Sequence, residues 1–123
     1  MRKTTLLLLS SIGIAIASHA SADEHSADFY MAACKKSLED RPLDERNVSA
    51  VHLQGACQGM VGAVAYLGPV LPEEFKACLP KGTLRSHLVS TVVKYVDGNP
   101  ERMKDDFVYQ AAKAIHEAFP CKK

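Results

Sequence analysis

Residues Val48–Leu67 read VSAVHLQGACQGMVGAVAYL. In a helix, apolar side chains would cover almost the whole circumference of this stretch, with Gly55, Gly59 and Gly62 among them. A strand is disfavoured because the stretch has no period of two and is rich in Ala and Gly. A helix with so little polar surface is buried on several sides. We therefore expect residues 48–67 to form the central helix, with its glycines allowing close packing.

A shorter helix is predicted before the central one, over residues 27–38. Its apolar residues recur at spacings of three and four, among them Phe29, Ala33 and Cys34. Residues 39–47 (EDRPLDERN), here called the connector, are charged and contain Pro42. We expect the connector to be a loop, with Asn47 or Ser49 capping the central helix.

Gly68-Pro69 ends the central helix, and residues 72–75 (PEEF) predict a short helical turn with Pro at its first position. Thr83 is then the expected N-cap of a third helix. Leu84, Leu88, Val92 and Val96 lie along one stripe of that helix. The spacing of four favours a helix over a strand despite the valines.

Residues 97–101 (DGNPE) predict the boundary before a fourth helix. Gly98 suits the left-handed position that ends a helix, Asn99 an N-cap and Pro100 the first helical turn. The fourth helix is therefore expected over residues 100–119, where Pro120 stops it. Together these elements predict an all-α fold: a small, disulfide-bonded four-helix domain in which two helical hairpins pack in an irregular, orthogonal manner.

The N-terminal residues have the pattern of a signal peptide. Arg2 and Lys3 supply positive charge, residues 4–17 are almost entirely apolar, and Ala20-Ser21-Ala22 offers small residues for a signal peptidase. We expect cleavage after Ala22 and a single mature domain over residues 23–123. An uncleaved membrane anchor is the alternative, but the apolar run is shorter than the roughly 20 residues that span a bilayer.

The expected mature chain is close to electroneutral. Two of the 15 basic residues lie in the leader, which leaves 13 against 14 acidic residues and a net charge of −1. No basic stripe or interleaved aromatic pattern is present, so the sequence does not favour nucleic-acid binding.

Cys34, Cys57, Cys78 and Cys121 all lie beyond the leader. An even number of cysteines in a short exported chain favours disulfides over zinc, and no CxxC pair argues otherwise. Four cysteines can form two disulfides in three different ways. Antiparallel hairpins would bring Cys34 to Cys57 across the first pair of helices, and Cys78 to Cys121 at the open end of the second pair. We predict these two bonds.

The residues that could support catalysis lack a recognisable arrangement. His25, His52, His87 and His116 form no HxxxH or HExxH pair, and no GxSxG or phosphate-binding glycine loop is present. A nucleophile with a base and an orienting group is not indicated. The sequence thus predicts a binding or structural protein and no enzyme, with no cofactor and no metal.

Several segments in order along the mature chain resemble the Rap/Tai family of immunity proteins. They are Phe29-Tyr30 with Cys34, Gly55-Ala56-Cys57-Gln58-Gly59 with Gly62 and Ala63, Cys78-Leu79-Pro80 with Gly82, Val92 to Val96 with Asn99-Pro100-Glu101, and Ala118-Phe119-Pro120-Cys121. The resemblance implies a helical, disulfide-bonded periplasmic protein that neutralises a peptidoglycan amidase effector of type VI secretion. It also implies a homodimer that plugs the amidase active site. Asn99 stands where the family pattern has His.

The matching residues are cysteines, caps, glycines and core aromatics, which carry the fold rather than the specificity. We expect specificity to lie on exposed loops. The candidate partner-binding residues are Asp40, Arg41, Asp44, Glu45 and Arg46 in the connector, and Glu73 and Glu74 in the turn over residues 68–76.

Two other functions remain open. One is an HdeA-like acid-stress chaperone of the periplasm, which would unfold at low pH through protonation of carboxylates and His and expose apolar surface. The other is a family member without an active effector partner.

Overall fold

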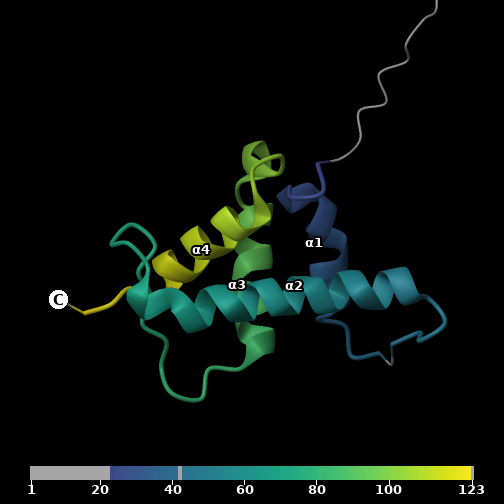
Figure 1. The fold of residues 1–123 in the computed structure, drawn as a ribbon, viewed down its shortest axis with the longest axis horizontal. Helices are drawn as coiled ribbons and strands as arrows, with labels where there is room; N and C mark the ends of the chain where they lie inside the picture. The colour runs from purple at the N-terminus through teal and green to yellow at the C-terminus, as the bar shows by residue number, and fades with distance from the viewer. Residues whose placement is uncertain (1–22, 42, 123) are drawn as a thin grey trace, which may run out of the picture.

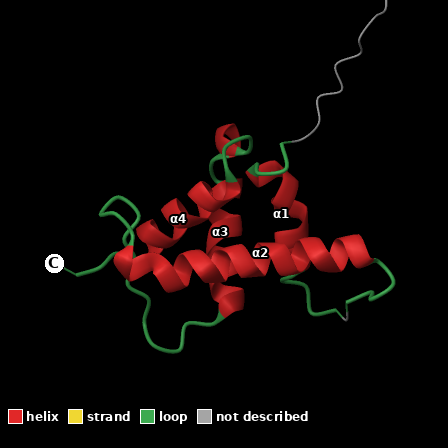
Figure 2. Cartoon of the chain, viewed as in Figure 1, coloured by secondary structure: helices red, strands yellow, loops and turns green. Residues whose placement is uncertain are grey.

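The computed structural model describes residues 23–41 and 43–122. In this part the chain forms four α-helices: α1 (Ala27–Lys36), α2 (Val48–Leu67), α3 (Arg85–Asp97) and α4 (Phe107–Ala118). Two short 3-10 helices follow α2 and α3, η1 (Gly68–Val70) and η2 (Pro100–Arg102). The remaining described residues are loops and turns (Figure 2). The fold is the predicted small all-α domain, whereas the predicted leader lies outside the described residues.

The central position of α2 is confirmed. Figure 1 shows α2 running crosswise to α1 and α3, and it contacts all three other helices. Its inward stripe carries Cys57, Val61 and Val64, all buried. One side of α2 thus packs against the other three helices, whereas Val48, Ala63 and Tyr66 on its opposite face are exposed, so the prediction that apolar residues are buried on several sides of this helix is wrong for that face.

The core lies where the four helices meet. Phe107 and Ile115 of α4 and Val92 and Val96 of α3 are almost fully buried there. The Phe107 ring centroid lies 5.1 Å from that of Tyr30, which joins α1 to this core. No helix in the described residues has the length and apolar character needed to cross a membrane.

Each hairpin is closed by a disulfide. Cys34 of α1 is bonded to Cys57 of α2, and both are completely buried. Cys78 is bonded to Cys121, where the chain entering α3 meets the chain leaving α4. There the backbone amide of Cys78 also donates to the carbonyl of Phe119 at 2.9 Å. These are the two bonds that hairpin geometry favours.

The predicted start of the fourth helix is wrong. Residues 100–102 form only η2, and α4 begins at Phe107, where the Asp106 carboxylate accepts from the Tyr109 amide at 3.0 Å. The cause is a tertiary contact: the Ala27 amide donates to the carbonyl of Asp105, and the Phe107 amide to that of His25. This pairing holds residues 105–107 against the start of α1, so a helix cannot run through them.

The ends of α1 and α3 also differ from the prediction. Lys36, and not Leu38, ends α1. Leu84 stands at the N-cap of α3, while the Thr83 hydroxyl donates to the carbonyl of Pro80 at 2.7 Å and closes a turn. Gly98 has right-handed helical angles, and the positive φ of 84° belongs to Gly82. The segment 72–75 is a hydrogen-bonded turn and no helix.

Close packing explains only part of the glycine content of α2. A Cβ on Gly62 would lie 2.7 Å from the Arg85 guanidinium, so Gly62 does allow a close approach. Gly55 and Gly59 have no described atom within 4 Å of such a Cβ and face open space. The expectation of close packing within the domain is therefore wrong for these two.

Candidate functional site

The cysteines and two of the histidines are engaged in the fold. All four cysteines are in disulfides, so the chain has no thiol nucleophile. His116 Nδ1 is 2.7 Å from the carbonyl oxygen of Lys76, and the His87 ring packs edge-on against Phe119. Among the described residues no group of His, Cys, Asp and Glu is arranged to hold a metal ion. The disulfides, the contact of His116 and the packing of His87 thus contribute to the fold.

Among the described residues, the pKa of one titratable group, the Tyr95 phenol, departs clearly from its usual value. Desolvation raises the pKa of the Tyr95 phenol, and the nearby Glu117 carboxylate raises that pKa further, against the opposing effect of Arg102. Arg102 Nη1 donates to the Tyr95 hydroxyl at 3.3 Å. A raised pKa keeps this phenol protonated near neutral pH, so it is unsuited to act as a base.

Ion pairs between residues close in sequence lie within the connector and at its start. Lys36 Nζ and Arg41 Nε lie 3.3 Å and 3.7 Å from the same Glu39 oxygen. Arg46 Nε donates to Asp44 Oδ1 at 3.0 Å. The connector leads into α2 through Asn47, whose side-chain oxygen accepts from the Ala50 amide at 3.1 Å, as one of the two predicted caps. Charged side chains thus stand on a loop that is anchored at both of its ends.

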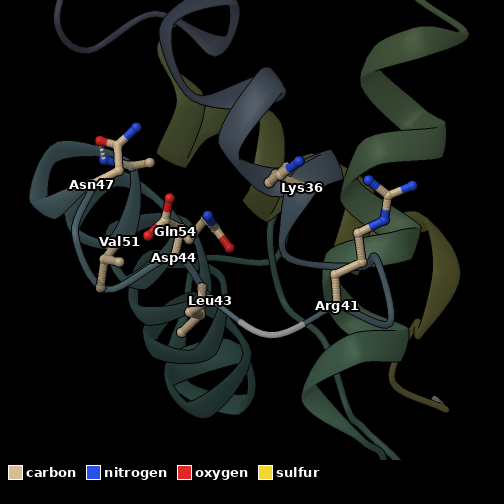
Figure 3. Close-up of a pocket in the computed structure, with 8 residues that line it drawn as sticks. Lys36, Arg41, Leu43, Asp44, Asn47, Val51 and Gln54 are labelled. Atoms are coloured by element: carbon tan, nitrogen blue, oxygen red, sulfur yellow. Dashed lines mark hydrogen bonds between the residues drawn. The ribbon is translucent and has the colours of Figure 1, made fainter.

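A hollow of about 240 Å³ lies between the connector and the facing ends of α1 and α2 (Figure 3). Its polar lining residues are Lys36, Arg41, Asp44, Asn47 and Gln54, and its aliphatic ones are Leu43, Ala50 and Val51. Figure 3 shows Lys36 and Arg41 on one side and the residues of α2 on the other. We call this cavity the connector hollow.

Gln54 is an unusual residue within the connector hollow. It occupies the inward stripe of α2 one turn before Cys57, and only 8% of its surface is exposed. Its side chain lines the connector hollow, whereas the buried side-chain atom without a hydrogen-bond partner among the described residues is Gln110 Oε1 of α4.

The turn over residues 68–76 is fastened to α4. The Ala77 amide donates to the carbonyl of Gly68 at 3.0 Å, and the Phe75 ring packs edge-on against Tyr109 with Lys113 Nζ 5.1 Å above it. A second hollow of about 240 Å³ lies here, lined only by apolar side chains of α2, the turn and α4. Glu73 and Glu74 are exposed beside it on the turn.

The two predicted contact regions lie at opposite ends of α2 (Figure 1). The helix has 20 residues, so it separates them by about 30 Å. Asp40, Arg41, Asp44, Glu45 and Arg46 cluster at its start, whereas Glu73 and Glu74 stand beyond its end. All seven are exposed. If the protein inserts one loop into one narrow cleft of a partner, that loop can come from only one of these two regions.

The sequence did not point to Lys36 or Gln54, which also line the connector hollow. The signal for Gln54 is its helical spacing: it stands three residues before Cys57, and therefore on the face that a disulfide forces inward. A polar residue at such a position is a departure from the apolar stripe. Lys36 carries no such signal because its role depends on where the connector folds.

The comparisons with known proteins agree with the fold and with its cysteines. No curated protein and no solved structure matches the chain. Residues 25–121 match the family described as Rap1a immunity proteins, a range that includes all four helices and both disulfides. Because the match covers well over half of the sequence, the chain belongs to the Rap1a family of immunity proteins.

Proposed function

We propose that this protein is a periplasmic immunity protein that binds and blocks a peptidoglycan amidase effector of type VI secretion and so protects the cell that makes it. The observation that carries the proposal is the family match over residues 25–121. The signal-peptide pattern of residues 1–22 and the two disulfides support export to an oxidising compartment. The mature protein in this proposal is the single domain over residues 23–123.

Inhibition by this fold would depend on a loop held in its bound shape. The Cys34–Cys57 bond fixes the two helices that flank the connector, and the Cys78–Cys121 bond directly follows the 68–76 turn. Ordering a loop before association reduces the entropy lost on binding, so an interface of about 800 Å² per partner can bind tightly. Exposed charges such as Arg41 and Glu45 would then select the partner.

The proposal includes a homodimer. Tyr66 and Val70 are large apolar side chains that lie mostly in solvent near the end of α2. Exposed apolar side chains that gather in one region are typical of protein contacts. Sedimentation of the purified protein tests the homodimer separately. A protein that stays monomeric at all accessible concentrations would contradict the homodimer.

Protection of cells tests the function. The full chain is expressed in a Gram-negative host together with each of a panel of type VI amidases directed to the periplasm, and lysis is followed. We expect protection against at least one amidase. A chain lacking residues 1–22 is the matched control and should not protect, because it stays in the cytoplasm. Lysis with every amidase, despite normal periplasmic accumulation of the protein, would contradict the proposal.

A further inference from the structure

We propose that the outer face of α2 packs against the same face of a second copy of this chain, with the two helices antiparallel and related by a two-fold axis at Gly59. This inference rests on the proposed function because it assigns an interface to the homodimer that the proposal includes. The outer face of α2, continued into η1, consists of Val48, His52, Gly55, Gly59, Ala63, Tyr66 and Val70.

The outer face has no neighbour within the described domain. Its residues recur at spacings of four and three, which places them on one side of a helix, and every one of them is exposed. A Cβ on Gly55 or Gly59 would have no described atom within 4 Å. In Figure 1, α2 passes in front of α3, so one long side of the helix is left uncovered. A helix face about six turns long is therefore available to a partner.

The composition of this face favours a protein contact over solvent. Residues 48–67 contain no Asp, Glu, Lys or Arg, although 24% of the chain is charged. The exposed side of a surface helix normally carries charged residues. Here Val48, Tyr66 and Val70 instead have 73%, 86% and 79% of their surface in solvent. Exposed apolar side chains that gather on one face mark a contact site, and a face without charge meets no like-charge repulsion when it pairs with itself.

The sizes of the side chains are symmetric about Gly59. Counted outward from Gly59 by four, seven and eleven residues, the equivalent pairs are Gly55 with Ala63, His52 with Tyr66, and Val48 with Val70. An antiparallel pair with its axis at Gly59 therefore joins small residues at the centre and large residues at both ends. Crossing helices approach most closely at one point and diverge beyond it, so the large side chains fill the widening gap. The face is thus complementary to itself, as a two-fold interface requires.

A hollow at the start of α2 lies where this pairing brings Tyr66 of the second copy. The hollow has a volume of about 440 Å³, and its lining residues are Phe29, Val48, Ser49, His52 and Leu53. In the antiparallel pair, Tyr66 of the second copy lies opposite His52, at the edge of the hollow. Its ring can then pack against Phe29 and the aliphatic walls. A projecting aromatic side chain and a hollow of suitable chemistry occur at opposite ends of one face, which gives two such contacts in each dimer.

The antiparallel arrangement joins two regions that a single chain keeps apart. The connector precedes α2 and the 68–76 turn follows it, so the length of the helix separates them by about 30 Å within one copy. In the pair, the connector of one copy lies at the same end as the turn of the other copy. One effector can then contact both segments, each supplied by a different chain.

A charge at the two-fold axis tests the interface. Sedimentation of the protein purified from the periplasm should show a reversible dimer with a dissociation constant on the order of 10 μM, because one helix face is a small interface. Ala also fits at position 59 between helices about 8–10 Å apart, so the test uses Gly59→Glu. Two facing carboxylates should weaken dimerisation at least about 100-fold. The helical signal should persist, since Glu is a good helix former and this face is open in the monomer.

Ala32→Glu is the matched control for Gly59→Glu. Ala32 is also a small, exposed residue inside a helix, but it lies on α1 and away from the outer face of α2. The same charge at this position should leave the dissociation constant of the dimer unchanged.

Two further variants identify the contacts. Gly59→Glu mixed with an equal amount of Gly59→Lys should form a mixed dimer, because position 59 meets itself at the axis and the charges then attract. Tyr66→Ala should weaken dimerisation at least about tenfold, as expected of an aromatic side chain buried at an interface. Its fold should be unaffected, because Tyr66 lies almost entirely in solvent in the single chain.

A spin label at Ser49→Cys tests the direction of the helices. All four native cysteines are in disulfides, so the new thiol is the labelling site. Ser49 lies ten residues before the axis, which places two labels roughly 30 Å apart in an antiparallel pair. In a parallel pair the labels would lie on the order of 10 Å apart. Dipolar electron spin resonance measures this distance.

Four results would overturn the inference: a dimer that survives Gly59→Glu, no mixed dimer from the Glu and Lys variants, unchanged dimerisation of Tyr66→Ala, or labels at the short distance. A wild-type protein that stays monomeric would overturn it as well, together with the homodimer. Failure of the proposed function is distinguishable. If the chain dimerises through α2 but no amidase is blocked, this interface stands and the function fails. If cells are protected while the dimer survives Gly59→Glu, the function stands and this inference fails.

Discussion

Two glycines of α2 and the glycine that follows the helix, Gly68, differ in what surrounds them, and this difference predicts opposite effects of the same substitution. Gly55 and Gly59 face open space within the described structure, so Gly55→Ala and Gly59→Ala should each stabilise the helix by about 0.5–1 kcal/mol. At Gly68 a Cβ would lie 2.8 Å from the backbone carbonyl oxygen of Ala77, which cannot move aside cheaply. Gly68→Ala should therefore destabilise the fold by about 1–3 kcal/mol.

Denaturant unfolding of the three variants measures these free energies directly. Gly55 and Gly59 both lie inside α2, so the intrinsic helical preference for Ala is common to these two positions. A loss of stability in Gly55→Ala or Gly59→Ala would mean that this face of α2 packs against something in solution, such as a second copy of the chain.

At the scale of single residues, the sequence predicts what depends on local chemistry. Asn47 is a cap because its own side chain reaches the backbone three residues later, and this can be read from the sequence. The place of Gln54 in the wall of the connector hollow depends on three segments that meet only in the folded chain. This position could not be predicted without the structure, although the spacing of Gln54 from Cys57 marks it as inward-facing.

Among the elements, α4 depends on a cap that the sequence pattern did not identify. The Asp106 side chain accepts from the Tyr109 amide, so Asp106→Ala should cost about 1 kcal/mol. Asp106→Asn keeps an acceptor in the same place and should cost much less. Thermal unfolding followed by circular dichroism measures both. Equal losses would contradict the assignment of the cap and would point to the charge of Asp106 instead.

The existence and order of the helices were predictable, because each has apolar residues at a helical period. The boundaries of the helices were less predictable from the sequence. The DGNPE segment does start a helix, but only the single turn of η2, since the chain at Asp105 and Phe107 is hydrogen-bonded to residues 25 and 27. These hydrogen bonds join residues that are about 80 positions apart in the sequence, so a local sequence pattern cannot predict them.

For the whole molecule, the two disulfides should differ in their accessibility to reductants. Cys34 and Cys57 are completely buried, whereas Cys78 is exposed. Under mild reduction of the native protein, alkylation and mass spectrometry should therefore show modification of Cys78 and Cys121 first. Loss of both pairs together, with no intermediate, would mean that reduction requires global unfolding. In the chain-entropy model the bonds contribute about 3 and 4 kcal/mol, so full reduction should unfold the domain.

The domain should also withstand acid. Every side chain in the ion pairs of the described residues is at least 36% exposed, and such surface pairs contribute about 0–1 kcal/mol each. Protonating their carboxylates removes little stability, so the helical signal should persist at pH 3 without binding of a dye that detects apolar surface. Loss of helix together with dye binding would favour the chaperone function instead.

The central claim is that this fold inhibits an amidase, and the most direct measurement is hydrolysis of purified peptidoglycan by type VI amidases in the presence of the periplasmic protein. The account predicts stoichiometric inhibition of a cognate amidase and a complex that elutes as one species in size-exclusion chromatography. It further predicts that reversing the charges of Arg41 and Glu45 in the connector weakens that inhibition. Full hydrolysis by every amidase at a molar excess of the protein, with no complex formed, would contradict the account.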